Sequence, residues 1–92
     1  MNREEIKEKL IALVAVIFQN FDVDMDLLEY VDFEDDLGMD SITFITLIVE
    51  IEEHFGIVVP DEIILMENFK TIADVTRIVA QCLCEQGGGK SV

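Results

Sequence analysis

The fold is decided by residues 36–56, which read DLGMDSITFITLIVEIEEHFG. Apolar residues recur here at the three- and four-residue spacing of an amphipathic helix, namely Phe44, Leu47, Ile48, Ile51 and Phe55. Asp40 is a suitable N-cap, because its carboxylate accepts hydrogen bonds from free N–H groups and its charge suits the positive helix end. Gly56 is a suitable stop, because glycine adopts the left-handed conformation that ends many helices. The pattern predicts a helix over residues 41–54.

Upstream of this stretch, a first helix is predicted over residues 3–18. Asn2 and Glu5 have the spacing of a capping box, in which each residue bonds to the backbone of the other. The expected inward stripe comprises Ile6, Leu10, Leu13, Val14, Ile17 and Phe18.

Residues 19–39 show no long regular pattern and are too many for an unanchored loop in a compact domain. We therefore expect a short helical turn near residues 25–30. Anchors to the core are expected among the scattered apolar side chains, which are Phe21, Val23, Leu27, Leu28, Val31, Phe33 and Leu37. Gly38 can end the loop sharply, because glycine takes positive φ at low cost.

Downstream of the central stretch, Pro60 breaks the chain, and a short third helix is predicted over residues 61–66. Thr71 and Asp74 form another capping-box pattern, which opens a fourth helix. The expected inward stripe of this last helix is Ile72, Val75, Ile78, Val79 and Leu83. Residues 57–59 are too few to form a sheet of their own.

Size and composition bound the architecture. With 92 residues and 51% hydrophobic content, the chain can build one tight core, but not a deep enclosed active site as well. The prediction is an all-α four-helix bundle over residues 1–86, with three main helices and a short third one. A flexible Gly-rich tail is expected over residues 87–92. Cys82 and Cys84 would point to different sides of a helix and cannot pair with each other, which fits a reducing cytoplasm.

Charge disfavours several classes of partner. The net charge is −14, and residues 10–69 contain no Lys or Arg but most of the 20 acidic residues. Nucleic acid and anionic membrane surfaces are disfavoured, because binding to them rests on basic side chains. The apolar run of residues 10–18 is shorter than the roughly 20 residues of a membrane span. Two readings of the acidity stay open: a docking surface for proteins with basic patches, or a charge that only maintains solubility.

The acidic residues do not predict a metal site. Asp22, Asp24 and Asp26 alternate as at the start of a calcium-binding loop. Leu27 and Phe33 stand where such a loop needs its glycine and its final glutamate, so calcium is not expected. The single histidine has no Cys or His cluster around it that would bind zinc.

Ser41 is the candidate for chemistry. A serine at a helix start is most often a cap, but here Asp40 can fill that role and leave the hydroxyl available. A helix N-terminus offers free N–H groups and a positive dipole end that suit a phosphate, and Gly38 would keep the approach open. A hydrolase using Ser41 and His54 is the weakest alternative, because thirteen residues of helix separate them by about 20 Å. His54 is read instead as a surface residue near the helix C-terminus.

The hexapeptide LGMDSI, residues 37–42, resembles the phosphopantetheine attachment motif of acyl and peptidyl carrier proteins. The resemblance extends over residues 3–84. It includes FEDD at 33–36, IEEHFGI at 51–57, VPDE at 59–62 and TIADV at 71–75. An isolated Asp-Ser pair is a weak signal, whereas this ordered set is a specific one.

The resemblance implies a right-handed four-helix bundle with Ser41 at the start of the second helix. A phosphopantetheinyl transferase would move 4′-phosphopantetheine from coenzyme A to Ser41, with Gly38 and Asp40 flanking it. The terminal thiol of the arm would carry an acyl or aminoacyl group as a thioester, and short acyl chains can fold into the core of such carriers. The protein would catalyse nothing itself. It would present its cargo to loading and synthase enzymes with basic docking patches, through a face lined by Ile42, Ile45, Val49, Glu50 and Glu53.

Three departures from the family pattern bear on the pathway. Thr43 and Thr46 stand where bacterial fatty-acid carriers often have acids, Phe44 is bulkier than usual, and residues 60–69 form a slightly longer segment. They favour a specialised stand-alone carrier for a polyketide, a nonribosomal peptide or an unusual acyl chain. We expect this carrier to be a cytoplasmic monomer. The alternatives are a housekeeping carrier of fatty-acid synthesis and, from another class, an unmodified acidic helical adaptor that binds a basic partner through the same face.

Overall fold

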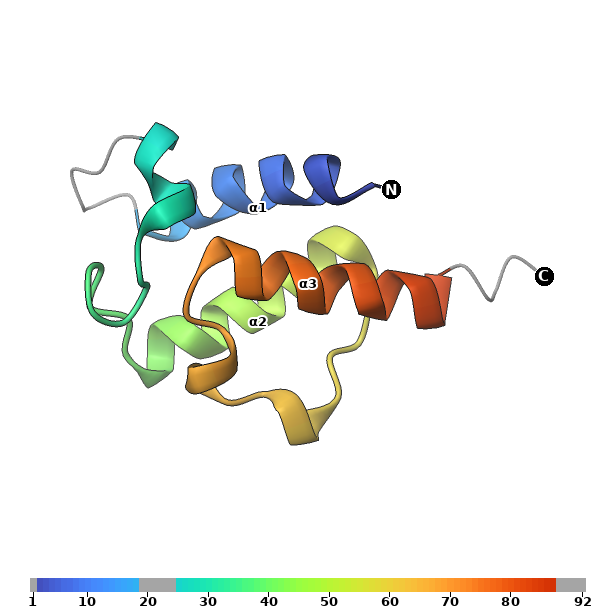
Figure 1. Cartoon of the computed structure of the whole chain (residues 1–92). Coiled ribbons are helices and arrows are strands. Elements are labelled where there is room, and N and C mark those ends of the chain that lie inside the picture. Colours follow the sequence, from blue (N-terminus) through green and yellow to red (C-terminus); the bar gives the residue numbers. More distant parts are fainter. Residues whose placement is uncertain (1, 19–24, 88–92) are drawn as a thin grey trace.

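Three α-helices form the framework of the protein (Figure 1). The computed structural model describes residues 2–18 and 25–87 of the 92-residue chain. The helices are α1 (Arg3–Ile17), α2 (Ser41–Phe55) and α3 (Ile72–Cys82). Three 3₁₀ turns and one π-helical turn accompany them, namely η1 (Met25–Tyr30), η2 (Asp61–Ile63), η3 (Met66–Asn68) and η4 (Leu83–Gly87). No strand occurs in the described ranges, which confirms the all-α prediction.

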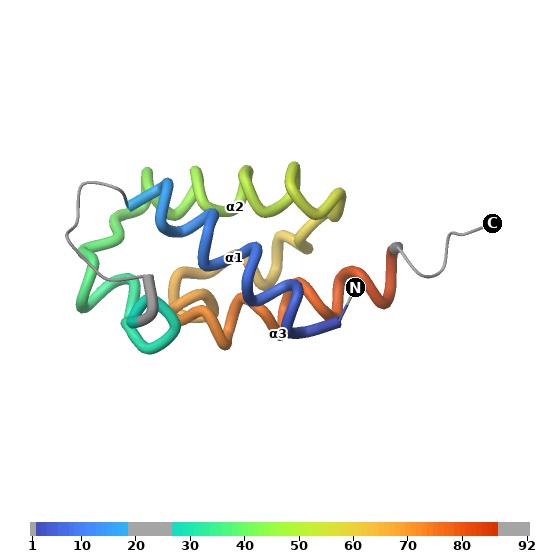
Figure 2. The backbone as a smooth tube through the Cα atoms, turned by 90° about the horizontal axis from the view of Figure 1, so that it is seen from above, coloured from blue at the N-terminus to red at the C-terminus, as the bar shows by residue number. Residues whose placement is uncertain are grey.

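The helices pack with α1 against both of the others. Figures 1 and 2 show that α1 runs in the opposite direction to α2 and α3, so that its N-terminal end lies near their C-terminal ends. The π-helical turn η4 continues directly from α3. Across the described part of the chain, no helix has both the length and the apolar content to cross a membrane.

The first helix begins as its sequence predicts. The Asn2 side chain accepts a hydrogen bond from the Glu5 N–H at 2.9 Å, and the Glu5 carboxylate accepts one from the Asn2 N–H at 3.1 Å. This reciprocal pair confirms the capping box. The inward stripe is also confirmed at Ile6, Leu10, Leu13, Val14 and Phe18. Ile17 is the exception, since it is only half-buried.

In its described residues, 25–40, the segment between α1 and α2 is anchored by only some of the predicted side chains. Its helical turn exists as the 3₁₀ turn η1, and the side chains of Leu28, Phe33 and Leu37 are buried. Leu27 is exposed, contrary to the prediction, and Val31 is half-buried. The other two predicted anchors, Phe21 and Val23, lie outside the described residues.

The predicted third helix over residues 61–66 begins at Asp61 as expected, but it is a single 3₁₀ turn that ends at Ile63 and is not an α-helix. Two separate 3₁₀ turns, η2 and η3, occupy this region. The carbonyl of Ile63 is taken by the Leu65 N–H at 2.9 Å and by the Asn68 side-chain amide at 3.0 Å, so its bonds do not follow the α-helical ladder. Neighbouring β-branched residues, Ile63 and Ile64, also weaken the tendency to form a helix. The bundle therefore has three α-helices and an irregular connection.

The last helix is capped with a small change from the predicted pattern. The Thr71 hydroxyl accepts a hydrogen bond from the Asp74 N–H at 3.2 Å, as a capping box requires. The Asp74 carboxylate, however, accepts from the Lys70 N–H at 3.2 Å, one residue before the cap. Of the predicted stripe, Leu83 is half-buried and the other members are buried. Cys82 and Thr76, which were not predicted to face inward, are buried as well.

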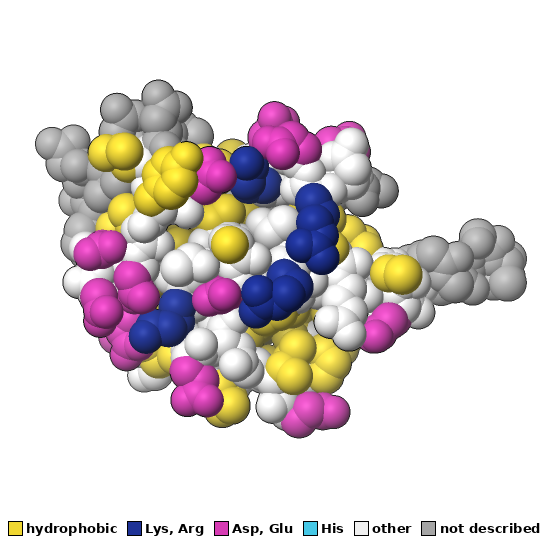
Figure 3. All heavy atoms as spheres, viewed as in Figure 1, with side chains coloured by type: hydrophobic (Ala, Val, Ile, Leu, Met, Phe, Trp, Pro, Cys, Tyr) yellow, Lys and Arg dark blue, Asp and Glu magenta, His cyan; other side chains and the backbone are white. Residues whose placement is uncertain are grey.

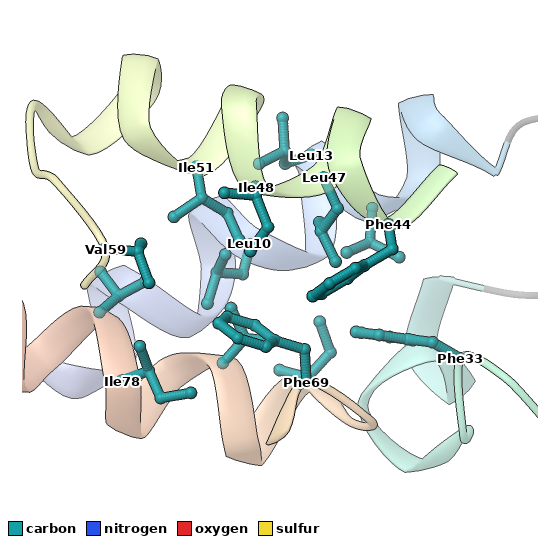
Figure 4. Packing of buried hydrophobic residues seen from close by; sticks show 14 of the residues in the cluster. Leu10, Leu13, Phe33, Phe44, Leu47, Ile48, Ile51, Val59, Phe69 and Ile78 are labelled. Carbon is teal, nitrogen blue, oxygen red and sulfur yellow. The ribbon is translucent and has the colours of Figure 1, made fainter. Parts of the chain in front are cut away.

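One hydrophobic core joins the helices and both connections (Figure 4). The Phe44 and Phe69 rings lie 5.5 Å apart between centroids, and Figure 4 shows them next to Phe33 at one end of the core. Ile51, Val59 and Ile78 fill the other end. The aromatic end supports the first turn of α2, and the functional candidate lies on that turn.

Candidate functional site

The approach to α2 is set by the backbone at Gly38. Its φ is +66°, a left-handed conformation that side-chain-bearing residues rarely adopt. A Cβ at this position would meet no atom within 4 Å, so the requirement is conformational and not one of space. The next residue, Met39, donates its N–H to the Phe33 carbonyl at 2.9 Å and is buried. The chain therefore enters α2 from a fixed direction.

Asp40 caps α2, as the sequence predicts. Its carboxylate accepts a hydrogen bond from the Thr43 N–H at 2.8 Å, and its carbonyl accepts one from the Phe44 N–H at 2.9 Å. The Thr43 N–H, followed by the Thr43 hydroxyl, holds the pKa of Asp40 below its ordinary value. Asp40 is therefore a fixed negative charge beside Ser41.

Ser41 is the first residue of α2 and is exposed to solvent. Among the described residues, none makes a hydrogen bond with its hydroxyl, because Asp40 performs the capping. An exposed primary hydroxyl at a helix N-terminus fits a phosphodiester, which would lie at the positive end of the helix dipole. The charged Asp40 carboxylate beside it disfavours binding of free anions at this helix start.

The only histidine lies far from this hydroxyl. His54 belongs to the last turn of α2, and its Nδ1 lies 3.2 Å from the Glu50 carbonyl oxygen and 3.8 Å from the Glu50 carboxylate. It is separated from Ser41 by about 20 Å of helix, at 1.5 Å per residue. The pair therefore cannot act together in a direct proton transfer.

The described residues contain no candidate metal site. Within residues 2–18 and 25–87, no three His, Cys, Asp or Glu side chains come together in a way that could hold a metal ion. Asp22 and Asp24 of the alternating acidic motif lie outside these residues, and so does the side chain of Asp26.

The outward face of α2 carries an apolar row that begins next to Ser41. Ile42 is 77% exposed, Ile45 60% and Val49 44%, although all three are large hydrophobic residues. Glu53 is exposed and Glu50 is partly exposed further along the helix. The Thr46 hydroxyl beside the row donates a hydrogen bond to the Ile42 carbonyl at 3.1 Å, so it adds no charge.

Within the described residues, the Lys and Arg side chains lie on elements other than α2, and three of them form ion pairs there. Figure 3 shows Lys and Arg side chains on the face seen in Figure 1, on which α1 and α3 lie in front. Lys7 pairs with Glu29 and Glu4 at 3.1 Å each, and these hydrogen bonds raise the pKa of the Lys7 ammonium. Lys70 lies 3.9 Å from Asp32, and Arg77 lies 3.6 Å from Asp74. The outward face of α2 therefore combines exposed apolar groups with acids and carries no cation of its own apart from a protonated His54.

Sequence reasoning missed one residue that builds the site. Met39 precedes the N-cap and Phe44 is the fourth helical residue, which are the two positions of a hydrophobic staple. Both side chains are buried in the same core. The signal was present in the sequence as an apolar residue directly before Asp40.

Comparisons with known proteins agree with this geometry. A family model described as "Phosphopantetheine attachment site" matches residues 8–79. An acyl carrier protein of Lactobacillus acidophilus is 36% identical over 80 residues, which cover 86% of this chain and 94% of that protein. One of Thermosynechococcus vestitus is 40% identical over 76 residues, with coverages of 82% and 88%. One of Myxococcus xanthus is 36% identical over 76 residues, with coverages of 79% and 92%.

The match spans α2 completely and includes most of α1 and α3. It therefore covers the helix start at Ser41 together with the core that supports it. The chain belongs to the acyl carrier protein family, whose members are carriers and not enzymes and bear a 4′-phosphopantetheine prosthetic group.

Proposed function

We propose that Ser41 is the attachment point of 4′-phosphopantetheine, delivered from coenzyme A by a phosphopantetheinyl transferase. The observation that carries the proposal is the exposed Ser41 hydroxyl, which has no hydrogen-bond partner among the described residues while Asp40 caps the helix. In the transfer, an Oγ–phosphorus bond forms at Ser41, the pyrophosphate bond of coenzyme A breaks, adenosine 3′,5′-bisphosphate leaves, and a base of the transferase takes the hydroxyl proton. The bound group supplies a thiol that carries an acyl or aminoacyl cargo as a thioester.

The transferase has to supply the base. No histidine lies near Ser41, and the nearest carboxylate, that of Asp40, is already engaged by the Thr43 N–H. Hydrogen bonding to its charged form makes Asp40 a weak proton acceptor. In this proposal, Asp40 and Gly38 hold the first turn of α2 in place, while proton removal takes place on the partner.

We also propose that partners dock on the outward face of α2, through Ile42, Ile45, Val49, Glu50 and Glu53. The exposed apolar row supports this proposal, because neighbouring large hydrophobic side chains on a small protein mark contact surfaces. The acids fit the basic patches expected on the transferase and on loading and synthase enzymes, and complementary charge speeds association.

For the pathway, we propose a specialised role in polyketide, nonribosomal peptide or unusual fatty-acid synthesis, with housekeeping fatty-acid synthesis as the alternative. The neutral Thr46, whose hydroxyl is bonded to its own helix, supports a docking surface less acidic near Ser41 than a typical fatty-acid carrier has. The bulky Phe44 packs on Phe69 beneath the same turn. We propose a cytoplasmic monomer, consistent with the two cysteines, which are both free thiols.

Intact-mass measurement tests the attachment point. The full chain is incubated with coenzyme A, Mg²⁺ and a transferase of broad specificity. We expect the mass of one phosphopantetheine to be added to the wild type and to Ser91→Ala, which removes the only other serine. Ser41→Ala should gain nothing. Addition to Ser41→Ala would overturn the assignment, and no addition to any variant would favour the unmodified adaptor.

A further inference from the structure

A small cavity lies between the connection that follows α2 and the C-terminal half of α3. Its volume is about 140 Å³. Pro60 and Ile63 line it from the connection, and Ile78 and Cys82 line it from α3. Cys82 is only 3% exposed, so the thiol belongs to the floor of the cavity. Figure 4 places Ile78 at the end of the core away from Phe44, which makes the cavity separate from the Ser41 site.

The rim of the cavity is acidic. Glu62, Gln81 and Glu85 complete the lining, and no Lys, Arg or His is among the lining residues. The Gln81 amide donates a hydrogen bond to the Glu85 carboxylate at 3.2 Å, which limits the directions that carboxylate can take. Within the described residues, neither glutamate takes part in an ion pair. The cavity therefore joins an apolar floor to two unneutralised carboxylates.

The negative field extends from the rim to the floor. Burial raises the pKa of the Cys82 thiol, and the charges of Glu85 and Glu52 raise it further. Only the smaller part of this effect, the repulsion from Glu85 and Glu52, also favours a positive charge at the rim. The contribution of Glu85 to this pKa shift agrees with its position in the cavity lining.

One wall of the cavity is held in place by a side-chain clamp. The Gln86 side chain accepts a hydrogen bond from the Val58 N–H at 2.9 Å and donates one to the Val58 carbonyl at 2.8 Å. The Glu52 carboxylate accepts from the Val59 N–H at 2.9 Å. Gln86 belongs to the π-helical turn η4, which continues from the end of α3. The connection is therefore fixed against the end of α3 directly beside the cavity.

We infer that this cavity binds a small branched aliphatic group that ends in an ammonium, with the Gln86–Val58 clamp fixing its wall. An apolar cavity of about 150 Å³ can hold a molecule of the size of benzene, so a group of similar size fits a cavity of about 140 Å³. The aliphatic part would lie on Ile63, Ile78 and Cys82, and the ammonium would bond to Glu62 and Glu85.

Two sources can present this chemistry: a free amine, and an aminoacyl cargo on the arm at Ser41. The second source rests on the proposed function. Along α2, Ile51 at this end of the core lies about 15 Å from Ser41, at 1.5 Å per residue. A long flexible arm attached at Ser41 is the kind of tether that could span such a distance. The two sources can be separated by experiment because only the second needs Ser41.

The first experiment uses 3-methylbutan-1-amine as the probe and the neutral 3-methylbutan-1-ol as its isostere. Each is titrated into the full unmodified chain while the methyl resonances of Ile63 and Ile78 are followed. We expect the amine to bind about tenfold more tightly, because hydrogen bonds to a charged partner are stronger. The preference should disappear in the double variant Glu62→Gln with Glu85→Gln and persist in Glu67→Gln, which alters an exposed acid outside the cavity lining. Equal affinity for both probes, or a preference that survives the double variant, would overturn the site.

The two cysteines provide a second readout. Cys84 is exposed and Cys82 is buried in the cavity floor, so the ratio of their alkylation rates reports access to the cavity. We expect Gln86→Ala to speed alkylation of Cys82 relative to Cys84, since it frees the wall. An unchanged ratio would show that the hydrogen bonds between Gln86 and Val58 do not control access to the cavity.

The last comparison assigns the source of the ligand. Leucyl and 4-methylpentanoyl groups differ by the ammonium, and each is loaded through the arm at Ser41. Slower alkylation of Cys82 with leucyl only would make aminoacyl cargo the occupant. Equal alkylation, with the free amine still binding, would exclude cargo and assign the cavity to free amines. If no arm can be attached to Ser41, the proposed function fails, while the titration with free amine still decides the cavity.

Discussion

The two ends of α2 have similar backbone geometry but differ in the hydrogen bonds that their polar side chains make. A glycine with left-handed φ stands near each end, Gly38 at +66° and Gly56 at +63°. At the N-terminal end, the cap is completed locally by Asp40, and the Ser41 hydroxyl is left without a partner among the described residues. At the C-terminal end, side chains of Glu52 and Gln86 are engaged by the backbone of the connection.

The difference follows from what comes next in the chain. The connection after α2 begins with residues outside any helical turn, and there the Val58 and Val59 N–H groups take side-chain partners, whereas the N–H groups of Ile63, Ile64 and Leu65 further on bond to carbonyls of the connection itself. Distant side chains provide those partners and are no longer available for other uses. At the start of α2 the Asp40 side chain takes the Thr43 N–H, and the Ser41 hydroxyl is left without a capping role.

The largest expected effect comes from removing the support beneath the N-terminal end. Phe33 is fully buried, its ring stacks on Phe18 at 6.1 Å, and its carbonyl accepts the Met39 N–H. We expect Phe33→Ala to lower the free energy of unfolding by about 3–5 kcal/mol, as large cavities in cores do. Urea unfolding followed by circular dichroism measures this loss. Tyr30→Ala, at a position 75% exposed, is the control and should change it by less than about 0.5 kcal/mol.

The two glycines give the next effect and test the comparison directly. Alanine at Gly38 or Gly56 would meet no atom within 4 Å, so the cost is the left-handed backbone alone. We expect each substitution to lower the free energy of unfolding by about 1–2 kcal/mol. The functional outcomes should differ, because only Gly38→Ala alters the entry to Ser41. Transferase kcat/KM should fall for Gly38→Ala and stay unchanged for Gly56→Ala. Equal losses of kcat/KM at both positions would contradict the separation of the two ends.

The smallest expected effect is the pH dependence of the cap. The folded-state pKa of Asp40 is lowered, so the stabilisation from its charge is fully present above its ordinary pKa of 3.8 and is lost as the pH falls through the folded value. Asp40→Asn keeps a good capping residue and removes the charge. We expect the variant to be less stable than the wild type at pH 6, with the difference shrinking below pH 3.8. Urea midpoints at several pH values measure it, and a difference that does not vary with pH would contradict the role of the charge.

The sequence predicted those parts of the fold that depend on neighbouring residues. The stripe of α2, its cap at Asp40 and its stop at Gly56 are confirmed, because periodicity and capping act within a few residues. The short third helix was predicted at its start, Asp61, but it ends at Ile63, where the Leu65 N–H and the Asn68 side chain take the Ile63 carbonyl; these contacts are close in sequence but follow no helical periodicity. The clamp between Gln86 and Val58 joins residues 28 positions apart, so no pattern within a few residues could predict it.

The sequence also predicted only the part of the candidate site that depends on neighbouring residues. Ser41 and the exposed residues of α2 could be named because the outward face is the complement of a clear inward stripe. The identity of the attachment residue and of the docking face stays a prediction that the mass and kinetic measurements test. Nothing in the sequence pointed to the cavity at Cys82, because its walls come from segments that only the folded chain brings together.

The contrast between the two cysteines has a consequence for stoichiometry. Cys82 is buried and Cys84 is exposed, and the chain has no other cysteine. The unmodified protein should therefore show one rapidly reacting thiol per chain in a colorimetric titration, and full denaturation should reveal a second. An attached pantetheine arm adds a further rapid equivalent. The number of rapidly reacting thiols per chain would then measure the fraction of protein that bears the pantetheine arm with a free thiol. The modified and unmodified species would not have to be separated first.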